Sequence, residues 1–265
     1  MTKWWAAALV AACLSPVPAR ALEIKNMRST YGAFGAVRTD ARILPGDLIA
    51  LMYDIEGLKV DPKTRKASLL TIMQLVDSAD VIHFTRENPM DVQVTLGGDR
   101  VPGELRLIIP PQQKPGKYKV KLKVTDRAAK ETKLHEYPFE VMPPAFGFIG
   151  VKAPAVGLPG DIYLAEFALV NFKLDNKKPK AEIHLRVLDD SGKDLSLPLL
   201  QQLPRDLPPD SDLTKQNFVP MPFPIYLNRP GRFILAIDAE DKNAKLQAKL
   251  RIPFTVMDLG QASSK

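Results

Sequence analysis

A four-residue element, Leu44-Pro45-Gly46-Asp47, returns as Leu158-Pro159-Gly160-Asp161 and constrains the fold more than any other feature. Three further landmarks recur in the same order, each 115 positions later: an aromatic residue followed by glycine, a Pro-Gly pair, and a Pro-Phe-x-Val-Met motif. Their first residues are Tyr31 and Phe146, Pro115 and Pro230, and Pro138 and Pro253. The spacing predicts one module of about 115 residues, the size of a single sandwich domain, used twice.

Apolar residues alternate with others inside each predicted module, as they do in strands with one buried face. The alternating sets after the two elements are Ile49, Leu51, Tyr53 and Ile55, and Tyr163, Ala165, Phe167 and Leu169. Most of the 24 prolines are scattered singly, which suits turns and sheet edges. We therefore predict an all-β fold of two tandem immunoglobulin-like antiparallel β-sandwiches arising from an internal duplication. An open barrel is the alternative.

Pro-Gly-Asp has the chemistry of a type II turn. Proline presets φ at the first central position, and glycine accepts a positive φ at the second. The aspartate side chain can then bond a nearby backbone N–H. We expect Asp47 and Asp161 to cap turns that start core strands, and ligand binding by either carboxylate is the alternative.

The amino-terminal residues resemble a secretion signal. Lys3 precedes a short apolar run, and Ala19-Arg20-Ala21 is a small-x-small cleavage site. No window is long and apolar enough to predict a transmembrane span. The predicted organisation is a signal peptide over 1–21, a first sandwich over 22–142, a proline-rich linker over 143–145, a second sandwich over 146–258 and a disordered tail over 259–265.

The single cysteine, Cys13, lies inside the predicted signal peptide. Val10-Ala11-Ala12-Cys13 resembles the lipobox of bacterial lipoproteins, and on that alternative Cys13 carries a lipid anchor. Cleavage after Ala21 instead leaves a mature chain without thiols, which excludes disulfides and thiol chemistry. We predict a secreted or periplasmic protein, with the lipoprotein as the alternative.

Signals of catalysis and of metal binding are sparse. The three histidines, His83, His135 and His184, have no metal-ligand spacing, and no nucleophile elbow or phosphate-binding glycine loop occurs. We predict no enzyme activity, cofactor or metal. Calcium remains an alternative for two acidic segments, although neither has the ligand spacing of a calcium loop. They are Asp189–Asp194 and the loop that contains Asp206, Asp210 and Asp212.

A row of lysines alternates with apolar residues after the first Pro-Gly pair, so that four ammonium groups project from one face at intervals of about 6.6 Å. Such a row can attract a polyanion, and it is the candidate binding site of the sequence. The alternatives are a solvated face and protection of a sheet edge. The four residues are Lys117, Lys119, Lys121 and Lys123.

The two modules also differ in residues expected to point outward. The first has Leu70 and Ile72, and the second has Ile234 and Ala236, the latter two in place of Lys119 and Lys121. Exposed apolar residues mark contact surfaces when they form patches. We predict that these residues contact the other module or a partner.

At its landmarks the chain resembles secreted bacterial proteins with tandem immunoglobulin-like domains. The resemblance implies the fold and export, and it supplies no active site. The leading hypothesis is an exported non-catalytic module with a structural, adhesive or protein-interaction role, whose partner is an envelope or extracellular protein or glycan and not a nucleic acid. The alternatives are a glycan- or polyanion-binding module and a hydrolase with a site in the interdomain cleft.

Overall fold

The computed structural model describes residues 21–195, 199–204, 218–258 and 260. The predicted signal peptide before Ala21, Cys13, three aspartates of the acidic loop and most of the predicted tail lie outside these ranges. The described residues form strands, turns and irregular segments, which confirms the all-β prediction. In this part of the chain there is accordingly no apolar helix of membrane-spanning length. The aspartates are Asp206, Asp210 and Asp212.

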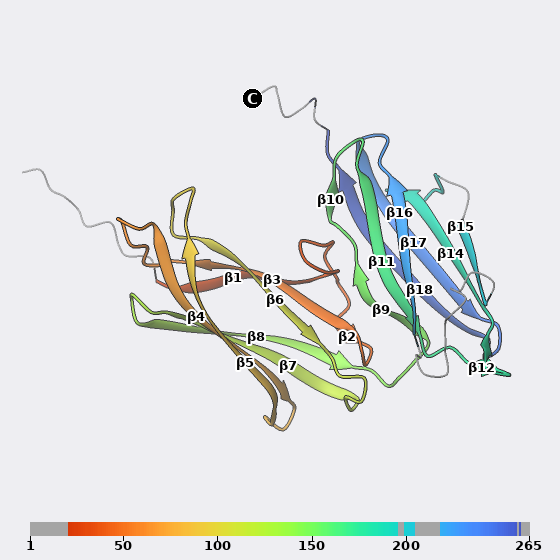
Figure 1. Ribbon diagram of the computed structural model, residues 1–265, viewed down its shortest axis with the longest axis horizontal. Helices are drawn as coiled ribbons and strands as arrows, with labels where there is room; N and C mark the ends of the chain where they lie inside the picture. Colours follow the sequence, from red (N-terminus) through yellow and green to blue (C-terminus); the bar gives the residue numbers. More distant parts are fainter. Residues whose placement is uncertain (1–20, 196–198, 205–217, 259, 261–265) are drawn as a thin grey trace, which may run out of the picture.

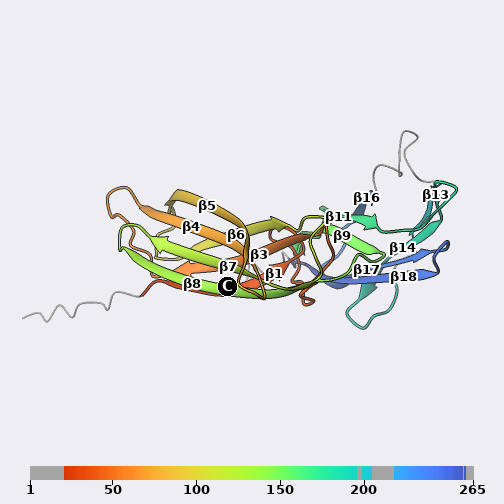
Figure 2. The ribbon, with the colours of Figure 1, turned by 90° about the horizontal axis from the view of Figure 1, so that it is seen from below.

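Residues 22–141 form two packed sheets, which Figure 2 shows from the side. Alternation places Leu51, Leu69 and Leu122 in a buried cluster between them. The smaller sheet has the order β1 (Glu23–Thr30), β3 (Leu48–Glu56), β6 (Val101–Ile108). The larger has the order β2 (Arg42–Ile43), β8 (Glu131–Val141), β7 (Gly116–Asp126), β4 (Lys66–Asp77), β5 (Ile82–Gln93).

The second half repeats this strand order (Figure 1) and has its own buried apolar cluster. Its smaller sheet is β9 (Gly147–Lys152), β11 (Ile162–Val170), β16 (Phe218–Tyr226), and β12 (Leu174–Asp175) pairs with β13 (Lys178–Pro179). Its larger sheet is β10 (Val156–Gly157), β18 (Leu246–Val256), β17 (Gly231–Asp241), β14 (Ala181–Asp189), β15 (Leu199–Leu203). We expected antiparallel sheets, but each larger sheet contains one parallel pair of strands. Duplication and immunoglobulin-like character remain predictions.

The register of the strands corrects one sequence landmark. Glu23–Arg28 pairs with β3 as Gly147–Lys152 pairs with β11, and both segments contain a bulge at a residue with positive φ, Asn26 or Gly150. The first strands are thus related by 124 positions (23 to 147, and 28 to 152). The aromatic-glycine segments at Tyr31 and Phe146 are therefore not structural equivalents, although their composition and spacing suggested it.

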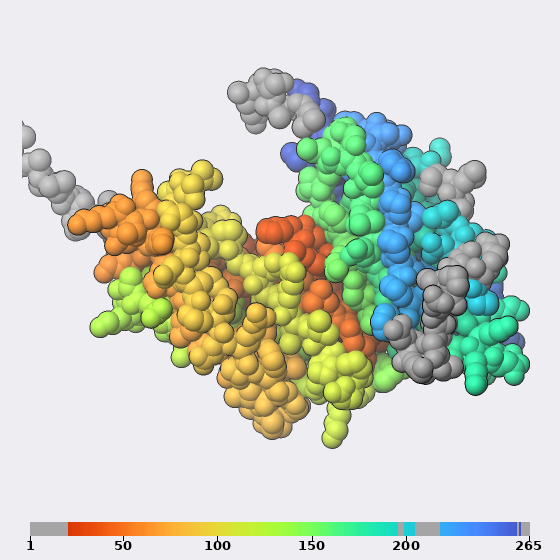
Figure 3. Space-filling view, in the orientation of Figure 1, coloured from red at the N-terminus to blue at the C-terminus, as the bar shows by residue number. Residues whose placement is uncertain are grey.

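The segment at Tyr31 belongs instead to an insertion in the first half. Thirteen residues (29–41) separate Arg28 from β2, whereas three (153–155) separate Lys152 from β10. The inserted loop crosses to the second half, where Ala153 N–H donates to the Tyr31 carbonyl and Ala36 N–H donates to the Ala153 carbonyl, both at 2.9 Å. Tyr31 and Ala36 join the apolar cluster of the second half. Figure 3 shows the loop, in red and orange, against the green atoms of β9 to β11.

Asp47 makes the second contact between the halves. One carboxylate oxygen accepts from its own turn at Leu48 N–H (2.8 Å) and from Gly150 N–H (2.7 Å), the residue with positive φ at the bulge of β9. The other oxygen pairs with Arg38 at 2.8 Å, and the Asp47 side chain is only 1% exposed. The predicted turn cap is thus present, but it also holds the two halves together.

Candidate functional site

The two sheets of the first half differ in width, and this leaves one strand uncovered. Directly opposite residues of paired strands point to the same face. Leu75, Met73 and Thr71 of β4 are buried, but their partners on β5 are Phe84, Arg86 and Asn88, all exposed. The core-facing side of β5 is therefore bare where a fourth strand of the smaller sheet would lie.

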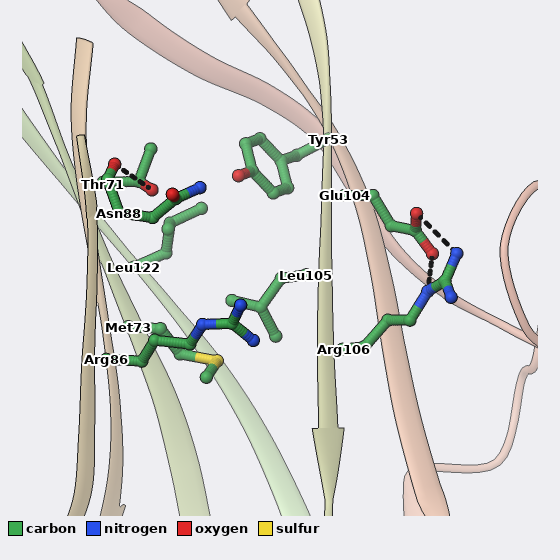
Figure 4. A pocket seen from close by; sticks show the side chains of 9 residues that line it. All are labelled: Tyr53, Thr71, Met73, Arg86, Asn88, Glu104, Leu105, Arg106 and Leu122. Carbon is green, nitrogen blue, oxygen red and sulfur yellow. Dashed lines mark hydrogen bonds and ion pairs between the residues drawn. The ribbon is translucent and has the colours of Figure 1, made fainter. Parts of the chain in front are cut away.

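The bare side of β5 and the edge of β6 enclose a groove of about 220 Å³ (Figure 4). Its floor consists of the buried apolar side chains of Met73, Leu105 and Leu122, which come from three strands. Tyr53, Thr71, Arg86 and Asn88 bring polar side chains to the groove, and Glu104 and Arg106 border it from β6 with their side chains pointing away (Figure 4). An apolar floor with a few polar groups around it is the usual composition of a binding site.

Tyr53 is positioned by a glycine. A Cβ at Gly103, which lies opposite Tyr53 on β6, would come within 2.2 Å of Tyr53 Cε2, so the ring occupies the space that a side chain would fill. The hydroxyl points into the groove in Figure 4. Burial, and then the Glu104 carboxylate, raises the pKa of Tyr53 to about 12. The phenol is therefore neutral at ordinary pH and can donate a hydrogen bond in the groove.

Arg86 and Asn88 bring two further polar side chains to the groove. In the described part of the chain, neither side chain has a hydrogen-bond or ion-pair partner, although the Asn88 carbonyl accepts from Thr71 Oγ1 at 3.3 Å. Glu104 and Arg106, in contrast, pair with each other along β6 (Figure 4). The groove thus presents a guanidinium, an amide and a phenol that a ligand can engage.

The four predicted lysines do share one face, but their strand is β7, in the interior of the larger sheet. Protection of a sheet edge is therefore the wrong explanation for them. The two central lysines are shared between two carboxylates: Lys119 lies 3.0 Å from Asp80 and 3.5 Å from Glu136, and Lys121 lies 3.5 Å from both. The hydrogen bond to Asp80 raises the pKa of Lys119. Lys117 and Lys123 at the ends of the row remain exposed.

The four residues of the predicted contact patches are covered to different degrees. Ala236 is fully buried (0% exposed), because Arg186 and Arg251 stand directly opposite it on the two neighbouring strands and both bind Asp238. Leu70, Ile72 and Ile234 are half-buried within their own sheets. The prediction that Ala236 is exposed was wrong, since long flanking side chains cover a short residue.

The acidic segment at Asp189 forms a turn. Its carboxylate accepts from Ser191 N–H at 3.0 Å and from Lys193 N–H at 2.9 Å. Among the residues that the structure describes, no three His, Cys, Asp or Glu side chains gather in a way that could hold a metal ion.

A second hollow, of about 550 Å³, lies between the halves. Gly46 and Pro111 contribute to it from the first half, and β9, β11 and β16 from the second. Its charged members, Lys152 and Glu166, pair with each other at 2.9 Å, and the described residues that line it include no histidine, serine or cysteine. The expected interdomain position for a hydrolase site therefore lacks a nucleophile beside a base.

No sequence motif pointed to the groove. Tyr53 was assigned to the core by its alternation, and Arg86 and Asn88 lie in a segment without a periodic pattern. The available signal was the uneven placement of proline between the halves, at Pro220, Pro222 and Pro224 but only at Pro102 in the matching segment.

No protein-family model matches the chain, and no curated protein matches it. Among solved structures, red sea bream transglutaminase is similar with a TM-score of 0.30 and 12% identity over 89% of this chain and 31% of that one. An alkylpurine DNA glycosylase, AlkC of Pseudomonas fluorescens bound to DNA with an abasic site analogue, has a TM-score of 0.31 and 18% identity over 47% of this chain and 32% of that one. The chain spans about a third of the length of either protein.

Proposed function

We propose that this protein is an exported, non-catalytic β-sandwich module of the bacterial envelope or the extracellular space, and that it works by binding another protein. The observation that carries the proposal is the groove between β5 and β6. It has an apolar floor and three polar side chains, Tyr53, Arg86 and Asn88, that are free to engage a ligand. The described residues that line it form no metal-binding cluster and include no nucleophile beside a base.

The chemistry of the groove favours recognition over reaction. Its ionisable members are a phenol that stays protonated, a free guanidinium and a Glu-Arg pair. The phenol stays neutral near neutral pH, so it does not serve there as the base that general acid–base catalysis requires. Donors around an apolar floor instead suit a polypeptide with apolar side chains and backbone carbonyls.

The test is photo-crosslinking in cells that produce the protein. A photoreactive amino acid at Asn88, on the rim of the groove, is expected to give a discrete adduct with one protein. The matched control places it at Lys249, an exposed position of β18 in the second half. Adducts of equal yield at the two positions, or none at either, would contradict the proposal.

A further inference from the structure

The free edge of β6 carries backbone groups that point away from its sheet. In an antiparallel sheet, alternate residues turn their N–H and C=O toward the same neighbour. Just beyond β6, Ile109 N–H donates to the Asp47 carbonyl and the Ile109 carbonyl accepts from Gly46 N–H, both at 2.9 Å. By alternation the backbone N–H and C=O groups of Leu105 and Leu107 also point toward β3. The backbone groups of four residues therefore face outward from the end strand of the sheet, and three of these residues have an N–H: Glu104, Arg106 and Ile108, but not Pro102.

The corresponding edge of the second half lacks two of these three donors. Leu227 just after β16 bonds to the Asp161 carbonyl and to Gly160 N–H, so the backbone groups of positions 220, 222, 224 and 226 point outward from β16. The first three are prolines, which have no N–H, and Tyr226 occupies the position of Ile108. By register on β11 and β3, Pro222 and Pro224 occupy the positions of Glu104 and Arg106. One of two matching edges is thus closed to strand addition, and the other is open.

We propose that an extended segment of a partner protein adds to β6 as a fourth strand of the smaller sheet, lying over the bare side of β5. The N–H groups of Glu104, Arg106 and Ile108 would donate to its backbone, which gives a segment of about five residues or about 17 Å of strand. This inference rests on the proposed function and specifies how the partner is held.

The lining of the groove defines the side chains of that segment. Every second residue of the added strand points between the sheets, toward Met73, Leu105 and Leu122, where apolar side chains fit. Arg86 is a free cation on the same side, so one inward residue is acidic. Phe84, which is 42% exposed on β5, is covered by the same strand.

A second copy of the chain does not fit this edge. If two β6 strands paired about a two-fold axis, the partner copy would bring its own β5 into the space beside β6 that the first β5 already borders. A single extended strand has no second sheet attached, and it fits between β6 and β5. The geometry therefore favours a segment over a folded copy.

The experiment selects a random eight-residue peptide display library on the full chain and measures the affinity of the enriched peptides. We expect sequences that alternate apolar residues and carry one acidic residue. The variant Glu104→Pro/Arg106→Pro copies the second half and removes two donors, so it is expected to weaken binding about tenfold or more. The matched control Glu104→Ala/Arg106→Ala keeps both N–H groups and is expected to bind within about threefold of the parent.

Hydrogen exchange on the parent protein supplies a readout that needs no variant. Bound peptide is expected to slow exchange at the amides of Glu104, Arg106 and Ile108 and to leave Lys249 unchanged. The proposal is overturned if no sequence is enriched, if the proline and alanine variants bind alike, or if the three amides stay unprotected. If the chain forms a dimer that the proline variant abolishes, β6 pairs with a second copy of the chain, and self-association replaces the proposal. In each case an adduct at Asn88 shows that protein binding itself still holds.

Discussion

The two halves have the same strand order but treat matching features in opposite ways. The Asp47 turn is buried under the second half, whereas the matching Asp161 is exposed and, among the described residues, its carboxylate accepts only from Leu158 N–H of its own turn. The edge of β6 is open, whereas β16 is closed by prolines. The first half therefore carries both the turn that contacts the other half and the proposed binding edge. In the described part of the second half the matching turn makes no such contact, and prolines close the matching edge.

The largest expected effect tests the two aspartates against each other. Asp47→Ala removes the partner of Arg38 and the acceptor of Gly150 N–H, leaving a largely buried charge unpaired. We expect it to lower the free energy of unfolding by about 3 kcal/mol. Asp161→Ala loses one exposed turn bond and is expected to cost about 1 kcal/mol or less.

Urea denaturation of both aspartate variants measures this difference. Because Asp47 joins the halves, its replacement is also expected to split a single transition into two. Equal losses for Asp47→Ala and Asp161→Ala would show that the interdomain bond contributes little.

A smaller effect is expected at Gly103, where the two halves pack differently. Alanine would place its Cβ 2.2 Å from the Tyr53 ring and displace it, whereas the second half has Met221 at the matching position opposite Phe167. We expect Gly103→Ala to cost about 2 kcal/mol and to alter the groove. The double variant with Tyr53→Leu is expected to lose less than the sum of the single changes. Additive losses in urea denaturation would contradict the contact.

The sequence predicted the strands better than it predicted their edges. Period-two alternation identified Ile49, Leu51 and their neighbours as core, because a strand with one buried face has an apolar residue at every second position. The insertion at Tyr31 was misassigned because an aromatic residue beside glycine serves a docking loop as well as a first strand. The groove exists because the two sheets contain different numbers of strands. The alternation within one strand does not predict how many strands its sheet contains. Only the prolines of β16 encode an edge locally.

Alkaline titration distinguishes Tyr53 from Phe167, its non-titrating counterpart. The pKa of Tyr53 is raised from about 10 in the unfolded chain to about 12. Its contribution to stability is therefore complete below pH 10 and is lost as the pH rises toward 12, by about 2 to 3 kcal/mol. Tyr53→Phe is expected to remove that loss. Burial also raises the pKa of Tyr163, which lowers the stability of parent and variant alike at high pH. The measurement is therefore the free energy of unfolding in urea at pH 9 and at pH 12, and the drop between them is compared for parent and variant. Parallel losses would contradict the assignment.

The smallest effect is expected for the lysine row, which the second half lacks. Replacing Lys117, Lys119, Lys121 and Lys123 by Gln is expected to change the salt needed for elution from heparin only slightly, since Asp80 and Glu136 already compensate the two central charges. Asp80→Asn with Glu136→Gln frees those lysines and is expected to raise the eluting salt more than the lysine replacements lower it. A large drop for the lysine variant alone would instead favour the polyanion-binding alternative, because it would mean that the row attracts a polyanion despite its carboxylates.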